Sequence, residues 1–82
     1  MRNESFDVPV TVETDRRQAV TDTVQAAGML LEGWPLDRRG PKYRAALRVC
    51  MDVLEQRRAV AGARKAFIAA AKEARLFVRV GA

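Results

Sequence analysis

The spacing of the apolar residues changes twice along this chain, and that change limits the fold more than any other feature of the sequence. Between residues 6 and 12, apolar side chains occupy every second position, which is typical of a half-buried strand. Three later stretches repeat apolar residues at helical spacing. Leu76, Val78 and Val80 then return to a period of two. The sequence therefore predicts the order strand, three helices, strand.

We predict one small α+β domain over residues 1–82, with residues 1–5 mobile. The two terminal strands are expected to pair as a two-stranded sheet against the helices, because an isolated pair of strands is marginal in water. Three antiparallel helices would make these strands parallel, whereas a tilted helix would make them antiparallel. Pro9 cannot donate a hydrogen bond to a neighbouring strand, so the first strand is expected at an edge or unpaired on one side there.

Start and stop residues accompany the predicted helices. Thr14 or Asp15 is expected to cap the first helix, with Gln18 in a capping-box position, and Gly33 is expected to end it. Pro41 suits the first turn of the second helix, and the third helix follows a break at residues 57–62. The apolar stripes expected to face the core are Val20, Val24, Ala27 and Leu31, then Tyr43, Leu47, Cys50 and Leu54, and finally Ala63, Phe67, Ala70 and Ala74.

Charge is unevenly distributed between the two halves of the chain. Residues 1–37 carry three basic and seven acidic side chains, whereas residues 38–82 carry twelve basic and three acidic ones, and the whole chain has a net charge of +5. The basic half also contains the two clearest helix patterns, so the positive charge is expected on ordered surface. An anionic partner, or a second copy of the chain, would feel this charge at long range.

Catalysis is the function class that the composition argues against most strongly. The chain has no histidine, so the usual general base near neutral pH is missing. Cys50 lies on an apolar stripe, where burial disfavours the thiolate. Asp52 and Glu55 share a helix face, but Arg48 can pair with Asp52, which favours a salt-bridged surface over paired acids. We therefore expect no enzyme, no cofactor and no Cys/His metal site.

The sequence also indicates a compartment. A single cysteine excludes an intrachain disulfide. The first residues lack the apolar run of a signal peptide, and no stretch approaches the roughly 20 apolar residues of a membrane span. A cytoplasmic protein without membrane contact is expected.

Two basic clusters are the candidate binding surfaces, for an anion, a nucleic acid or a protein partner. Four cations of the third helix fall in one quadrant around Ile68, which either anchors a partner or packs against Trp34 or a strand. The other cluster surrounds the start of the second helix, where cations oppose the helix dipole. Its members either form ion pairs with Glu32 and Asp37 or bind phosphate. The candidate residues are Arg64, Lys65, Ile68, Lys72 and Arg75, together with Arg38, Arg39, Lys42, Arg44 and Arg48.

Four segments spread over nearly the whole chain form a recognisable set. They are Phe6-x-x-Pro9-Val10-x-Val12, Ala26-Ala27-x-x-Leu30-Leu31-x-x-Trp34-Pro35, Gly40-Pro41-x-Tyr43-x-x-Ala46-x-x-x-Cys50 and Ala63-Arg64-x-Ala66-Phe67-Ile68-x-Ala70-Ala71-x-Glu73-Ala74. As a set they resemble the bacterial family known as domain of unknown function 982. The resemblance implies a small mixed helix–strand domain and no activity, since none is assigned to that family. Residues 55–60 are more basic than the family pattern, so a role of that surface would not carry over.

Two function classes follow, and a small enzyme is the least supported third. The first is a non-catalytic interaction or scaffold protein that forms a homodimer through helix faces or a strand edge. The second is an electrostatic nucleic-acid-binding protein that uses the two basic clusters and whose binding weakens with salt. A helix-turn-helix with Gly62 at its turn fits poorly, because Arg58 stands where that motif has a small packed residue.

Overall fold

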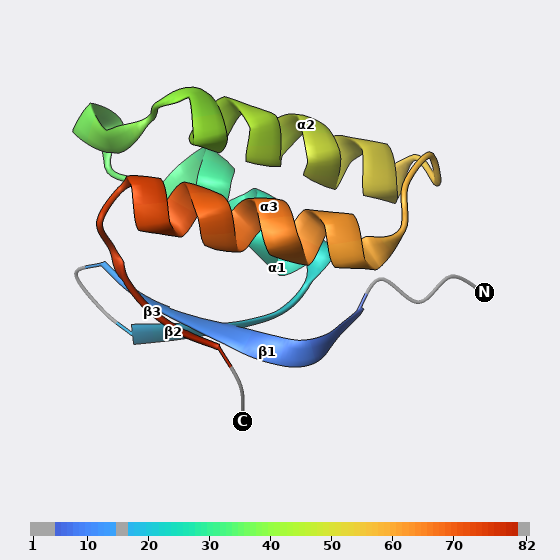
Figure 1. Ribbon diagram of the computed structural model, residues 1–82, viewed down its shortest axis with the longest axis horizontal. Coiled ribbons are helices and arrows are strands. Elements are labelled where there is room, and N and C mark those ends of the chain that lie inside the picture. Colours follow the sequence, from blue (N-terminus) through green and yellow to red (C-terminus); the bar gives the residue numbers. More distant parts are fainter. Residues whose placement is uncertain (1–4, 15–16, 81–82) are drawn as a thin grey trace.

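Three helices cover one face of a small antiparallel sheet (Figure 1). The computed structural model describes residues 5–14 and 17–80. Its elements are β1 (Ser5–Glu13), β2 (Arg17–Asp22), α1 (Thr23–Gly28), a π-helical turn (Met29–Gly33), a 3-10 turn (Leu36–Arg38), α2 (Pro41–Leu54), α3 (Val60–Glu73) and β3 (Phe77–Val80). The α+β class expected from the sequence is confirmed. Ser5 already belongs to β1, and the rest of the segment expected to be mobile lies outside the described residues.

The sheet contains one strand more than the sequence predicts. Its order is β2-β1-β3, with β1 antiparallel to both neighbours. The pairing of the first and last strands is confirmed, and their direction is antiparallel. The expectation of a two-stranded sheet is wrong, because residues 17–22 form β2 rather than the start of a helix. β1 is therefore the central strand.

The first helix begins at Thr23, about two turns later than expected. Asp22 is its N-cap, and the carboxylate of Asp22 accepts a hydrogen bond from the Gln25 amide at 2.8 Å. The side chain of Gln25 in turn accepts from the Thr21 amide at 2.9 Å, in a variant of the capping box. Thr14 does not cap a helix, and Asp15 lies outside the described residues.

This later start turns α1 so that its buried face differs from the predicted stripe. Val24 and Leu31 are exposed, whereas Thr23, Ala26 and Leu30 are buried. Val20 is buried as expected, but from β2. The helical segment ends at Gly33, as predicted, and Trp34 continues in an extended conformation.

Pro9 lies in an irregular part of the central strand. The pairing of β1 with β2 shifts register between Ser5 and Val10, and regular pairing with both neighbours begins at Val10. A residue without an amide hydrogen is tolerated where the ladder is interrupted. The edge position considered for this strand is wrong, and the interruption explains how a central strand accommodates the proline.

The core is built around Phe67 and Trp34, at the join between α3 and the loop that precedes α2. The two rings meet edge to face with centroids 5.8 Å apart, and Tyr43 lies 6.0 Å from Trp34 on the other side. The Tyr43 hydroxyl donates to the buried carbonyl of Leu30 at 2.6 Å. Trp34 donates from Nε1 to the Arg38 carbonyl at 3.3 Å. These contacts tie the Leu36–Arg38 turn to α2, α3 and the π-helical turn.

Both long helices end in the same way. α2 ends in a Schellman motif, in which the Gln56 amide donates to the Val53 carbonyl at 3.0 Å, and α3 ends in another around Arg75. Gln56 and Arg75 have φ angles of 66° and 60°, in the left-handed region usually occupied by glycine. Gly62 lies in the first turn of α3 rather than between the helices, which removes the glycine turn on which a helix-turn-helix interpretation depends.

Candidate interaction surfaces

Cys50 is fully buried on α2, and its environment suits a packing residue. Burial raises the pKa of the Cys50 thiol from 9.0 to about 11. The thiolate is the reactive form of cysteine, so this thiol is unreactive near neutral pH. The sequence-based view of Cys50 as a core residue agrees with this position.

The raised thiol pKa leads to an expected dependence of stability on pH. The thiol of the unfolded chain ionises near pH 9, whereas that of the folded chain stays protonated until about pH 11. The stabilising contribution is therefore complete below pH 9 and is lost as the pH rises from 9 to 11. When the pH is raised from 8 to 10.5, the free energy of unfolding measured by chemical denaturation should fall more for the natural chain than for Cys50→Ala. An equal loss in the two proteins would contradict this assignment.

The carboxylates Asp52 and Glu55 each form a salt bridge with an arginine that follows α2. Asp52 lies 3.4 Å from the guanidinium of Arg58, and Glu55 lies 3.6 Å from that of Arg57. The expected pairing of Asp52 with Arg48 is wrong, because the turn after α2 brings Arg58 back over the last turn of the helix. Within the described parts of the chain, no three metal-ligating side chains come together.

In the basic cluster before and within α2, three arginines contact backbone carbonyl oxygens. Arg38 donates to the Ala74 carbonyl at 3.2 Å, and Arg39 donates to the Trp34 carbonyl at 3.1 Å. The Arg39 guanidinium also lies over the Tyr43 ring, 5.2 Å from its centroid. Arg44 makes a longer contact of 3.5 Å with the Arg39 carbonyl. Arg38 and Arg39 contact carbonyl oxygens and a ring, so their expected pairing with Glu32 and Asp37 is wrong, and phosphate binding by this cluster stays a prediction.

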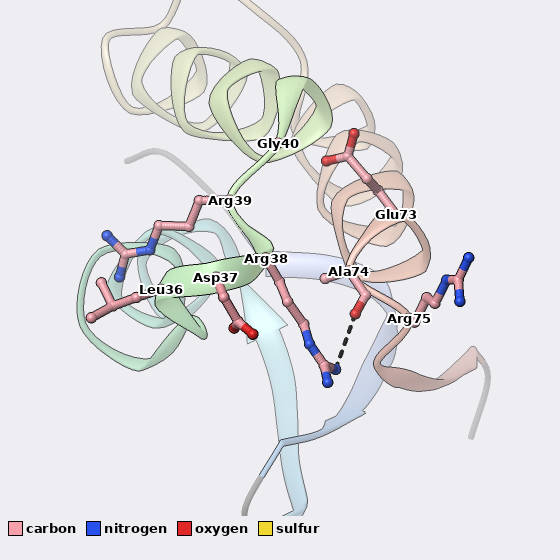
Figure 2. Close-up of a pocket in the computed structure, with 8 residues that line it drawn as sticks. All are labelled: Leu36, Asp37, Arg38, Arg39, Gly40, Glu73, Ala74 and Arg75. Carbon is pink, nitrogen blue, oxygen red and sulfur yellow. Dashed lines mark hydrogen bonds between the residues drawn. The ribbon is translucent and has the colours of Figure 1, made fainter.

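Arg38 and Glu73 form crossed caps between α2 and α3. Arg38 precedes α2 and binds the carbonyl at the C-terminus of α3, where a cation is favoured by the helix dipole. Glu73 is the last residue of α3, and its carboxylate accepts from the amides of Lys42 and Tyr43 in the first turn of α2, at 3.1 to 3.3 Å. In Figure 2, Arg38 reaches the Ala74 carbonyl while Glu73 points toward the Gly40 turn.

The crossed caps limit which ligands the groove beside them can bind. This groove has a volume of about 580 Å³ and is lined by residues 36–40 and 73–75. The amides at the start of α2 already bind the Glu73 carboxylate, so a phosphate at this helix terminus would have to displace an internal anion. Gly40 leaves room for the Glu73 carboxylate, because a Cβ at this position would lie 2.8 Å from a Glu73 oxygen and would displace it.

The structure divides the cations predicted to share one face of α3. Arg64 turns toward the sheet, where it donates to the Val8 carbonyl at 2.8 Å and lies 3.8 Å from Asp7. Ile68 is half-buried and packs against the core, so it does not stand exposed among cations. Arg75 lies beyond the end of α3 and lines the groove beside the crossed caps, as Figure 2 shows. The cations that remain exposed on α3 itself are Lys65 and Lys72.

β3 carries exposed apolar side chains on both of its faces, which the sequence patterns did not single out as exposed. Phe77 is 55% exposed and Val80 is 49% exposed. Leu36, 82% exposed, shares with Phe77 a groove of about 960 Å³ at the end of the sheet. The signal for Phe77 was present in the sequence, because its position alternates with Leu76 and Val78 and places it on the opposite face of the strand.

A family model for "Protein of unknown function (DUF982)" matches residues 8–78, which runs from β1 to β3 and takes in every helix. The chain belongs to the DUF982 family. The resemblance drawn from the sequence segments is thereby confirmed. The DUF982 description assigns no activity. No curated protein and no solved structure matches this chain.

The segments by which the chain resembles DUF982 lie mainly in its core. Trp34, Tyr43, Cys50 and Phe67 are all buried. These residues contribute to the packing of the helices rather than to the exposed surface. In the parts of the chain that the structure describes, no helix has the length and apolar character to cross a membrane.

Proposed function

We propose that this DUF982 protein is a small non-catalytic interaction protein that forms a homodimer through the outer edge of β3. The observation that carries the proposal is the exposure of Phe77 and Val80 on a strand that has a neighbour on one side only among the described strands. An unpaired edge offers a row of backbone donors and acceptors to another strand. Leu36 adds one more exposed apolar side chain at the groove that it shares with Phe77, although most of the other residues that line this groove are polar or charged.

The other edge of the sheet is less suited to pairing. β2 exposes Arg17, Gln18 and Thr21, which are charged or polar, and only the small Ala19 among its apolar residues, whereas β3 exposes the large Phe77 and Val80 beside Arg79. Charged and polar side chains on an edge strand disfavour edge-to-edge association, whereas exposed apolar side chains favour it. We therefore assign self-association to β3.

Side-chain alternation limits how two copies of β3 can pair. Residues directly opposite in an antiparallel pair lie on the same face of the sheet, so Phe77 can oppose Phe77 or Arg79 but not Val78. A two-fold axis at Arg79 would place two arginines opposite each other, which is unfavourable. An axis at Val78 instead places Phe77 opposite Arg79 of the second copy, a cation–π arrangement. The favoured dimer therefore joins two sheets in the order β2-β1-β3-β3-β1-β2.

The test compares two exposed valines that differ in their place on the fold. Val80 lies on the β3 edge and Val24 lies on α1, with exposed fractions of 49% and 59%. Val80→Lys introduces a charge at the proposed interface, and its dimer dissociation constant is expected to rise by about tenfold or more, because a lysine on an edge strand opposes edge-to-edge pairing. Val24→Lys carries the same chemical change and should leave the constant unchanged. Sedimentation equilibrium measures both.

Two results of that comparison would contradict the proposal. One is a natural chain that stays monomeric at every accessible concentration. The other is an equal weakening by Val80→Lys and Val24→Lys, which would indicate general charge repulsion rather than an interface at β3. Thermal melts of both variants at high dilution serve as the control, since neither valine is buried and the monomer should keep its stability.

A further inference from the structure

A second surface of the molecule lies between α2 and α3, away from the β3 edge. The two helices run side by side in opposite directions (Figure 1), and a groove of about 290 Å³ follows their outer side. Small side chains form its floor, and three cations form its rim. The floor residues are Ala45, Val49, Gly62, Ala66 and Ala69, and the rim residues are Lys42, Arg58 and Lys65.

The carboxylates nearest to this groove are engaged in other contacts. Glu73 binds the backbone amides at the start of α2. Asp52 lies 3.4 Å from Arg58 and neutralises part of its charge. The groove lining itself contains no acidic residue, and Lys42 and Lys65 form no ion pair with any residue that the structure describes. The rim therefore keeps a positive charge that faces solvent.

The positive charge continues along α3 beyond the groove. Lys72 follows Lys65 by seven residues, which is two helical turns, so both side chains project from one exposed ridge. Their separation along the helix axis is about 10 Å. Duplex DNA presents a phosphate about every 3.4 Å of axis on each strand, so both ammonium groups can reach phosphates of one duplex at the same time.

We propose that the rim and ridge, comprising Lys42, Arg58, Lys65 and Lys72, bind the phosphate backbone of duplex nucleic acid without reading its sequence. Lysine binds phosphate as a point charge, and a floor of small residues lets the backbone approach closely. The groove has no asparagine or glutamine to recognise adenine edges, and Arg58, the arginine in its lining, is paired with Asp52 at 3.4 Å rather than free to recognise guanine. It also has no aromatic ring on which unpaired bases could stack, which disfavours a single strand. The floor side chains have no polar group to hold the amides of a peptide.

Fluorescence anisotropy tests this proposal with a labelled duplex of about 20 base pairs at several salt concentrations. Lys42→Ala with Lys65→Ala is expected to weaken duplex binding by about tenfold at low salt and to reduce the salt slope by about two, one for each lost phosphate contact. The matched control is Arg17→Ala with Arg57→Ala. It removes the same net charge from two exposed arginines outside the groove and should change the affinity by less than about threefold.

Three outcomes would overturn the proposal. The first is the absence of duplex binding at low salt. The second is an equal loss of affinity in the two double variants, which would mean that net charge alone attracts the duplex. The third is stronger binding to single-stranded DNA of the same sequence, or to polyglutamate, than to the duplex. None of these outcomes depends on the state of the β3 edge, because the substituted residues lie outside β3.

Discussion

Trp34→Ala is expected to lower the free energy of unfolding by about 3–5 kcal/mol, the usual cost of truncating a buried aromatic residue. Trp34 is buried between Tyr43 and Phe67, with ring centroids at 6.0 and 5.8 Å. Its indole N–H also fixes the Arg38 carbonyl, and therefore the turn from which Arg38 reaches α3. A chain of this size has a total stability of roughly 4–12 kcal/mol, so this loss is a large fraction of the total, and the variant should unfold at a much lower urea concentration.

Urea denaturation of Trp34→Ala and Trp34→Phe checks this expectation, with circular dichroism as the readout because the natural fluorophore is removed. The phenylalanine variant keeps a ring between Tyr43 and Phe67 but loses the hydrogen bond, so its loss should be smaller, about 1–3 kcal/mol. A loss below about 1 kcal/mol in the alanine variant would show that Trp34 does not organise this core.

Gly40→Ala is expected to lower the free energy of unfolding by about 1–2 kcal/mol through the crossed caps. The new Cβ would lie 2.8–2.9 Å from the Glu73 carboxylate, closer than two such groups can approach. The backbone of Gly40, with φ −93°, accepts alanine without strain. The flexible Glu73 side chain should therefore move away and leave the amides of Lys42 and Tyr43 without their internal acceptor.

A double-mutant cycle separates this mechanism from a general packing defect. If Gly40→Ala acts by displacing Glu73, then Glu73→Ala should cost a similar amount, and the double variant should cost little more than either single one. Gly62→Ala is the control, because its Cβ would make only an ordinary contact of 3.6 Å with Val49. That variant should be neutral or up to about 1 kcal/mol more stable. Additive losses in the cycle would rule out the crossed caps as the cause.

The elements that the sequence predicts well are those whose patterns are long and undisturbed. α2 and α3 keep the buried stripes expected for them, with Tyr43, Cys50, Phe67 and Ala70 in the core. β2 was missed because Val20 stands at helical spacing from the apolar residues that follow it. The sequence contains the true start in Asp22 and Gln25, but a similar arrangement at Asp15 and Gln18 competes with it. Pairing with β1 decides between them, and that contact is not local.

The candidate surfaces were harder to predict, because their residues are engaged by distant parts of the chain. Arg64 binds a carbonyl 56 residues earlier, and Arg38 binds one 36 residues later. The sequence places Arg64 on a charged helix face and Arg38 in a basic loop, but it gives no information about such partners. Lys65 and Lys72 are exposed, as expected for cations on the outer side of α3. The exposure of the apolar side chains of β3 could not be predicted without knowing that this strand lies at the edge of the sheet.

Sedimentation equilibrium of the natural chain over a wide range of concentrations is the most direct test of self-association at β3. We expect the mass to rise with concentration from that of one chain to that of two and then to remain constant, because a two-fold edge pairing closes on itself. A mass that stays at one chain throughout would contradict the proposed homodimer. A mass that continues to grow beyond two chains would contradict the symmetric β3 pairing.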